Sequence, residues 1–185
     1  MVGEIRDLET AEMAIQAALT GHLLVSTIHT NSAAGAIPRF LSMGVKPFLL
    51  APALNAVIGQ RLVRKIHDVC KTETTIPPDQ LVRVKEVLSK LSPKSGYKID
   101  LEKMKFSYGK GCEGCFKTGF KGRIGIYEIF TMTPEIEKII LSGQVSEYQM
   151  QDVAIEQGMI SMVQDGLLKA LDGITTVEEV FSVAE

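Results

Sequence analysis

Two cysteines, Cys112 and Cys115, are separated by Glu113 and Gly114 in a short glycine-rich stretch of the chain. This spacing is more typical of a metal-binding knuckle than of a structural disulfide, because two thiolates on one tight turn can face a single ion. The chain contains three cysteines, so they cannot all pair with one another. The pattern therefore predicts a metal site and argues against a disulfide framework.

A second group of chemically capable side chains follows two predicted strands near the N-terminus. The carboxyl ends of parallel strands meet at one edge of a sheet, where ligands bind, so we expect these side chains to meet in a site. From spacing alone, the alternatives are a solvated charge pair after a strand and, for His22, a structural histidine. The side chains are Glu4, Arg6 and Asp7 after the first strand, and His29, Thr30 and Asn31 after the second.

The elements that must position these groups alternate between strand and helix. The run HLLVSTIHT, residues 22–30, is almost continuously apolar and rich in β-branched residues, which predicts a central strand covered on both faces. Such alternation is typical of an α/β fold with a parallel sheet and crossover helices. The helices are predicted over 9–20, over 33–43 with Asn31 or Ser32 as the cap, and over 47–58.

Composition limits the classes of protein that the chain can belong to. It has 185 residues, 45% hydrophobic residues and a formal net charge of −2, so it can bury a sizeable core and carries no charge excess that favours nucleic acid. No apolar run reaches the roughly 18 residues of a membrane span, and the N-terminus lacks the features of a signal peptide. We expect a cytoplasmic protein that neither spans a membrane nor binds nucleic acid.

Four stretches of the sequence carry a resemblance to a known family. The first, MVGEIRDLETAEMAIQAALTGHLLVSTIHTNSAAGAI, resembles the Walker B segment and histidine box of the type II secretion and type IV pilus assembly ATPases. Later family signatures are similar, in the same order, to FLLAPALNAVIGQRLVRKI, GKGCEGCFKTGFKGRIGIYEI and MVQDGLLKALDGITTVEEVF. Only residues 71–105 or so lack a clear counterpart, so the resemblance covers most of the chain.

The resemblance implies the C-terminal portion of a RecA-like P-loop ATPase core with a truncated sheet. It divides the chain into core residues 1–66, a metal-binding knuckle with a variable insertion over 67–130, and a helical subdomain over 131–185. The family's phosphate-binding loop, G-x-x-x-x-G-K-S/T, is absent, because the pair Gly109-Lys110 is followed by Gly111. We therefore expect a C-terminal fragment of a longer enzyme.

Catalytic roles follow from the resemblance position by position. Glu4 matches the Walker B glutamate, whose carboxylate orients or deprotonates the water that attacks the γ-phosphate. His29 matches the second histidine of the histidine box and is expected to sense that phosphate. Arg6 is expected to contact the nucleotide or, with Asp7, to hold the shape of the site.

The resemblance also extends the cysteine pair to a set of four ligands. Assembly and secretion members of the family often carry two C-x-x-C pairs, and here the earlier pair reads HDVC, with His67 in place of one cysteine and Cys70 retained. Together with Cys112 and Cys115 these residues form a Cys₃His set, which suits a structural Zn²⁺. The alternative is a metal-free relic with buried thiols.

As a whole, the resemblance implies a hexameric motor that hydrolyses ATP with Mg²⁺ and powers type IV pilus assembly or type II secretion. Its expected partners are other copies of itself, an inner-membrane platform protein and a cytoplasmic docking protein, which would place it at the inner membrane of a bacterium. Without the phosphate-binding loop, the chain alone is expected to be inactive. The alternative is a noncatalytic zinc-binding adaptor of the same machinery.

Overall fold

The computed structural model describes residues 1–184 and groups the chain into two compact units. The first combines Met1–Gly59 with Ile129–Met159, and the second combines Gln60–Glu128 with Ile160–Glu185. Both units are discontinuous in sequence, whereas the sequence analysis divides the chain into three consecutive segments. The functional assignment of those three segments stays a prediction.

The first unit is mainly helical. Asp7 begins its first helix, since the Thr10 amide donates to the Asp7 carboxylate at 2.8 Å. The helical spacing of Ala11, Ala14 and Ile15 predicts one apolar face, and the structure confirms it, because all three side chains are buried. The unit contains α1 (Leu8–Leu19), α2 (Ala36–Ser42), α3 (Pro47–Ala53), the start of β1 (Ala56–Ile66), the end of β4 (Phe120–Thr131), α5 (Pro134–Leu141) and α6 (Glu147–Glu156).

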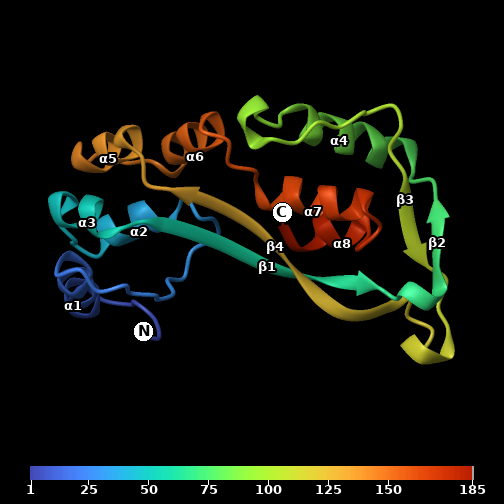
Figure 1. Cartoon of the computed structure of the whole chain (residues 1–185), viewed down its shortest axis with the longest axis horizontal. Coiled ribbons are helices and arrows are strands. Elements are labelled where there is room, and N and C mark those ends of the chain that lie inside the picture. Colours follow the sequence, from blue (N-terminus) through green and yellow to red (C-terminus); the bar gives the residue numbers. More distant parts are fainter. Residues whose placement is uncertain (185) are drawn as a thin grey trace. The chain divides into compact units, whose positions relative to one another are not determined.

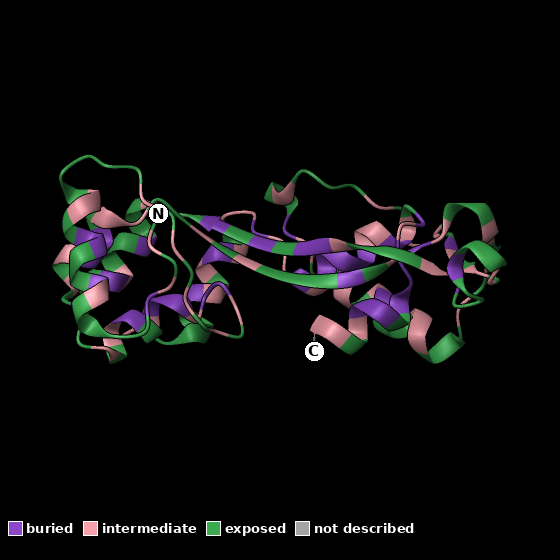
Figure 2. Ribbon diagram, turned by 90° about the horizontal axis from the view of Figure 1, so that it is seen from below, coloured by how far each residue is buried: buried purple, intermediate pink, exposed green. Residues whose placement is uncertain are grey.

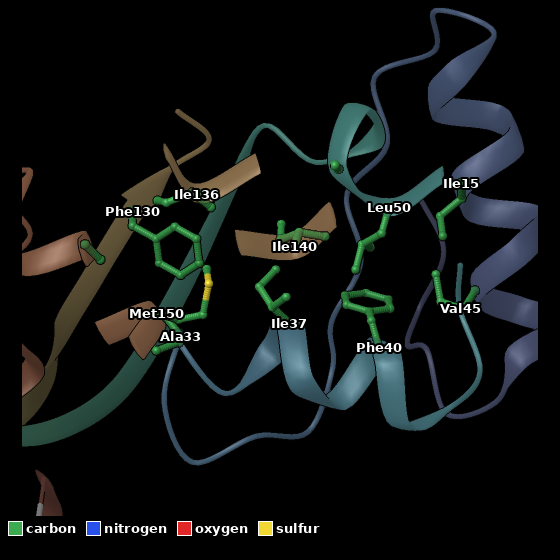
Figure 3. Packing of buried hydrophobic residues seen from close by; sticks show 14 of the residues in the cluster. Ile15, Ala33, Ile37, Phe40, Val45, Leu50, Phe130, Ile136, Ile140 and Met150 are labelled. Carbon is green, nitrogen blue, oxygen red and sulfur yellow. The ribbon is translucent and has the colours of Figure 1, made fainter. Parts of the chain in front are cut away.

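The core of the first unit joins early and late parts of the chain. Ile37 and Phe40 of α2 point toward Ile140 of α5 and Leu50 of α3 (Figure 3). Each large apolar side chain that is fully buried in this way contributes about 1.5–3 kcal/mol relative to an exposed one. Met150 of α6 is buried in the same cluster. Helices α5 and α6 therefore belong to the unit that carries Glu4 and His29.

The two predicted N-terminal strands are extended but are not part of a regular ladder. Backbone bonds run from Val2 N to Val25 O at 3.1 Å and from Ile5 N to Thr27 O at 2.8 Å, in the expected parallel direction with α1 as the crossover. The prediction that residues 22–30 are covered on both faces is wrong, because Leu23 is 87% and Val25 is 61% exposed. From Leu24 to Thr30 the even-numbered side chains are partly buried and the odd-numbered ones are exposed, so the described chain covers one face.

Two predicted helices have different bounds. Helix α2 begins after Gly35 rather than at a cap by residue 31 or 32, and Ser32 Oγ instead accepts from Gly35 N at 3.0 Å. Helix α3 ends at Ala53 and not at Ile58, because Leu54 is extended and β1 begins at Ala56. The apolar run alone does not distinguish a helix from a strand, and pairing of β1 with β4 decides the outcome.

The second unit contains the rest of β1 and β4, whose other ends belong to the first unit, together with a second strand pair and further helices. Met132 N donates to Asn55 O, and His67 N donates to Gly119 O, both at 2.9 Å, so β1 and β4 run antiparallel (Figure 1). Along β4, buried Ile126 and Phe130 alternate with exposed Ile129 (Figure 2). The other elements are η1 (Asp68–Cys70), β2 (Lys71–Thr74), α4 (Pro78–Ser89), η2 (Pro93–Ser95), β3 (Phe106–Gly109), η3 (Glu113–Cys115), α7 (Met162–Leu171) and α8 (Val177–Ala184).

Strands β2 and β3 form a short antiparallel pair that ends beside the cysteines, with Lys71 opposite Gly109. Thr176 is followed three residues later by Glu179, which predicts the start of a last helix, and Glu179 N donates to Thr176 Oγ1 at 3.3 Å at that start. The Glu179 carboxylate turns instead to the guanidinium of Arg64. The unit is thus held by apolar packing of α4, α7 and α8 together with this partly buried ion pair.

Candidate functional site

Three of the predicted site residues lie together in the first unit. Glu4 Oε1 lies 2.7 Å from Arg6 Nη2, and Glu4 Oε2 lies 2.9 Å from His29 Nε2. Glu4 and His29 are 25 positions apart and meet because residues 2–5 and 22–30 run side by side, which also lets Thr27 Oγ1 donate to Gly3 O at 2.9 Å. The structure therefore brings the predicted carboxylate and imidazole into hydrogen-bond contact.

The electrostatics of this cluster favour an ionised carboxylate. The hydrogen bond from the Arg6 guanidinium lowers the pKa of Glu4 below its ordinary value of 4.5, and the hydrogen bond from His29 acts in the same direction against partial desolvation. An ionised Glu4 only accepts, so His29 Nε2 must carry the proton in this contact. The cluster is open to water, because the side chain of Glu4 is 34% exposed and that of His29 is 80% exposed. A carboxylate of this kind can orient a water molecule and accept its proton.

The neighbouring polar residues have local structural roles. Asp7 caps α1 and does not contact Glu4 or His29 through any described hydrogen bond. His22 Nδ1 lies 3.2 Å from Thr20 Oγ1 at the end of α1, which fits the structural interpretation of that histidine. Thr30 Oγ1 donates to Ser32 O at 2.8 Å and so shapes the turn that follows His29.

One contact beside this cluster has no signal in the sequence. Ser32 Oγ donates to Glu147 Oε1 at 2.5 Å, although the two residues are 115 positions apart. Glu147 is the first residue of α6, and nothing in its local sequence distinguishes it from an ordinary acidic residue in the first turn of a helix. No periodicity or spacing rule could have linked it to Ser32.

The four predicted metal ligands lie together in the second unit. Their donor atoms all lie within 4.8 Å of one another. The Sγ atom of Cys115 lies 3.7 Å from that of Cys112 and 3.9 Å from that of Cys70, and His67 Nδ1 lies 3.2 Å from Cys112 Sγ. Around a tetrahedral zinc with Zn–S bonds of about 2.3 Å, two sulfur ligands lie roughly 3.8 Å apart. The donor set and its spacing therefore fit zinc.

Tight turns produce this arrangement. Lys117 N donates to Cys112 O at 2.8 Å, which closes the turn around the later cysteine pair. Phe116 and Lys117 take positive φ angles of 52° and 61° to do so. At Gly114, an added Cβ would lie 3.2 Å from His67 Cε1, so a larger residue would press against the histidine ligand. The glycine is needed here for space.

The thiols of Cys115 and Cys70 differ in pKa before any metal binds. Burial opposes the thiolate of Cys115, but hydrogen bonds from Cys112 N at 3.2 Å and Gly119 N at 3.3 Å outweigh it and lower the pKa of Cys115 to about 6. Burial raises the pKa of Cys70. Zinc binds thiolates, so Cys115 is the ligand best prepared for it and Cys70 must release a proton on binding.

Comparison with known proteins identifies the family of this chain. Residues 1–182 match the family model described as "Type II/IV secretion system protein". The chain belongs to this family. Among the described residues, no helix combines the length and the apolar character that crossing a membrane requires.

Relatives in this family are similar over nearly the whole chain. The type IV pilus assembly ATPase PilB of Thermus thermophilus is 44% identical over 182 residues, which are 98% of this chain and 19% of that protein. The type II secretion system protein HxcR of Pseudomonas aeruginosa is 38% identical over 183 residues, which are 99% of this chain and 33% of that protein. The chain thus spans between about a fifth and a third of the length of these relatives.

A solved structure shares the fold of this chain. The ATPase DotB of Legionella pneumophila superposes with a TM-score of 0.60 at 20% identity, over 98% of this chain and 37% of that one. At this identity the likeness concerns the fold alone. The RecA-like character expected from the sequence is consistent with this likeness.

Proposed function

We propose that this chain is the Walker B and zinc-bearing portion of an ATPase motor that powers type IV pilus assembly or type II secretion. Two findings support the proposal: the family membership, and the identity to a pilus assembly ATPase and to a type II secretion protein. The observation that carries it is the contact between Glu4 and His29, which joins a carboxylate and an imidazole from the two strand ends where the family pattern requires them.

In this proposal Glu4 orients the attacking water and accepts its proton during phosphoryl transfer. Arg6 keeps the carboxylate ionised, and His29 holds one of its oxygens while it responds to the γ-phosphate. Mg²⁺, when bound with ATP, neutralises charge on the β- and γ-phosphates. No stretch of residues 1–185 matches the phosphate-binding loop, so we propose that other residues of a longer protein supply it.

We further propose that the complete protein works as a hexameric ring at the cytoplasmic face of the inner membrane. Its partners would be an inner-membrane platform protein and a cytoplasmic docking protein of the same machinery. The type II/IV secretion family and the pilus assembly relative support this assignment. This chain would then contribute one wall of each ATP site.

The zinc site is the second part of the proposal. His67, Cys70, Cys112 and Cys115 would hold one Zn²⁺ with four protein ligands, which leaves no open position for a catalytic water and makes the metal structural. The fit of the sulfur spacings to tetrahedral zinc supports this role. This chain holds four possible metal ligands but only part of an ATP site. That difference favours a second candidate, a noncatalytic zinc-binding adaptor.

Phosphate release and nucleotide affinity separate the two candidates. The complete protein that contains this chain should hydrolyse ATP with Mg²⁺, whereas the 185-residue chain alone should neither hydrolyse ATP nor bind it tightly. Glu4→Gln in the complete protein keeps the size of the side chain but removes the base, so turnover should fall by about 10²–10⁴-fold while nucleotide still binds.

The control is Glu12→Gln, an exposed glutamate of α1 away from the cluster, which should leave turnover unchanged. Full turnover by Glu4→Gln would remove Glu4 from the catalytic role. A complete protein with no ATP turnover at all would favour the adaptor.

Elemental analysis tests the metal separately. Protein purified under reducing conditions should contain about one zinc per chain, as expected for a structural site. A content near zero that added zinc does not raise would contradict the assignment and favour the metal-free relic.

A further inference from the structure

The loop that follows His29 is organised around one serine. We call residues 30–35 the His29 loop. Within it, Thr30 Oγ1 donates to Ser32 O at 2.8 Å and Gly35 N donates to Ser32 Oγ at 3.0 Å. Ser32 also makes a hydrogen bond outside the loop, since its hydroxyl donates to Glu147 Oε1 at 2.5 Å. Ser32 is therefore the point at which α6 holds the His29 loop.

Gly35 indicates how closely the loop and α6 approach. Its φ and ψ angles of −69° and −14° are ordinary helical values, so its backbone does not require glycine. An added Cβ would lie 3.2 Å from Ser32 Oγ and 3.4 Å from the carboxyl carbon of Glu147. A Cβ at this position would crowd Ser32 Oγ and stand in contact with the Glu147 carboxylate. The glycine thus leaves room for the contact between Ser32 and Glu147.

Helix α6 is a firm support for this contact. Ser146 caps it, since Gln149 N donates to Ser146 Oγ at 3.1 Å, so the helix starts at a defined point beside Glu147. Its residues Met150 and Ala154 are buried in the same core as Ala33, the neighbour of Ser32, and Figure 3 shows Met150 beside Ala33. The Glu147 carboxylate is therefore presented to the loop by a packed element.

The side chain of His29 is weakly restrained by its own contacts. Its side chain is 80% exposed, and its described side-chain contact is the one with Glu4. The position of the imidazole thus depends on the backbone of residues 29–32, which the bond between Ser32 and a charged acceptor restrains. Hydrogen bonds to charged groups are roughly twice as strong as neutral ones.

We propose that Glu147 is a positioning residue for the pair formed by Glu4 and His29. By holding Ser32, it makes the placement of the His29 imidazole depend on α6, so a movement of α5 and α6 is transmitted to the ATP site. This inference rests on the proposed function of that pair. A misplacement of about 1 Å in a catalytic group can lower a rate by about 10²-fold, so a partial loosening has a measurable cost.

The first test uses the 185-residue chain and needs no activity. NMR at fixed pH follows the imidazole nitrogens of His29 and the carboxyl carbon of Glu4. Glu147→Ala and Ser32→Ala should shift these signals in the same way, and the double variant should add nothing further, because both remove one interaction. Glu147→Gln should give a smaller shift, since its amide oxygen still accepts from Ser32. Glu156→Ala, at the other end of α6 and exposed, is the matched control.

The second test uses the complete protein. Glu147→Ala should lower kcat for ATP about five- to tenfold with KM changed less than about twofold, because positioning acts on the chemical step. Glu147→Gln should restore part of the rate, and Glu156→Ala should match the wild type. A midpoint of thermal unfolding is recorded for each variant, so that a loss of stability is recognised.

The outcomes distinguish this inference from the proposed function. If Glu147→Ala lowers the unfolding midpoint but leaves the NMR signals of His29 and the kcat equal to those of Glu156→Ala, the contact is only structural and the inference fails. If the complete protein hydrolyses no ATP, or Glu4→Gln is fully active, the proposed function fails. In that case the NMR comparison still decides whether Glu147 positions His29.

Discussion

The cysteine–histidine cluster and the pair formed by Glu4 and His29 are built in opposite ways. The cluster has four donors within 4.8 Å of one another, on short turns whose backbone bonds also reach a sulfur. The pair lies on two extended segments that two described backbone hydrogen bonds join, and the side chain of His29 is 80% exposed. The cluster offers four possible metal ligands within this chain, whereas the pair consists of two side chains that are open to solvent.

Because of this difference, we expect the cluster to contribute to folding stability and the pair to contribute to activity. Metal binding to preorganised ligands adds directly to the folding free energy of the surrounding turns. A water-orienting carboxylate contributes little to stability, because its interactions are exposed, and acts only when substrate is held beside it. Damage to the cluster should therefore unfold structure, and damage to the pair should change activity alone.

The largest expected effect is the loss of one zinc ligand. Cys112→Ser should reduce zinc affinity by several orders of magnitude, because structural zinc sites contribute about 10–16 kcal/mol of apparent binding free energy. Hydrogen exchange measured by mass spectrometry should rise over residues 67–130 and stay unchanged over α1. Val69→Ala, in the turn between two ligands but 82% exposed, is the control and should keep the metal. An equal rise in exchange over α1 would contradict the local role of the metal.

The next largest effect is a loss of ATP turnover without a loss of stability. In the complete protein, His29→Ala should lower ATP turnover about tenfold to about 10²-fold, less than Glu4→Gln, because it removes a partner of the base and not the base itself. Phosphate release measures this effect. Zinc content and the unfolding midpoint should match the wild type, and a loss of zinc in this variant would break the separation of the two sites.

A smaller effect concerns the pH dependence of zinc binding. The pKa of Cys115 is lowered to about 6 and that of Cys70 is raised, so near neutral pH Cys115 is already a thiolate and Cys70 is not. Release of the Cys70 proton alone should therefore raise zinc affinity by up to about tenfold between about pH 7 and about pH 8. Competition with a zinc indicator measures this affinity, and a decrease over that interval would contradict the assignment.

The smallest effect is on Glu4 itself. Arg6→Gln should raise the pKa of Glu4 toward its ordinary value of 4.5, because it removes the largest interaction that favours the carboxylate. A depressed carboxyl pKa adds stability above the unfolded pKa and loses it as pH falls through the folded pKa. The variant should thus remove a small stabilisation that is present at neutral pH, without a measurable change in unfolding midpoint, because the pair is exposed. Carbon NMR titration of Glu4 is the measurement, and an unchanged or lower pKa would contradict it.

Local patterns predicted much of the fold. The spacing of Ala11, Ala14 and Ile15 predicts the buried face that α1 has. The alternation in GRIGIYEIF predicts a strand, Pro134 predicts the start of a helix, and Thr176 with Glu179 predicts the start of a last helix; β4, α5 and α8 lie at these places. The errors lie where a run of apolar residues fits two structures. Residues 54–58 fit a helix by spacing, but pairing with β4 makes this region the start of a strand. Residues 22–30 fit a strand covered on both faces, yet Leu23 and Val25 are exposed.

By itself the sequence determined the types of the functional groups and the short-range geometry around them. The pair Cys112 and Cys115 follows from spacing, and the cap by Thr176 follows from a hydrogen bond that spans three residues. The family resemblance had already grouped His67 with the later cysteines, and the pairing of β1 with β4 brings them together. Only the tertiary structure decided that Glu147 reaches Ser32 across 115 positions. The reason is physical: local hydrogen bonds are encoded within a few residues, whereas distant contacts arise from the burial of apolar faces that no short window contains.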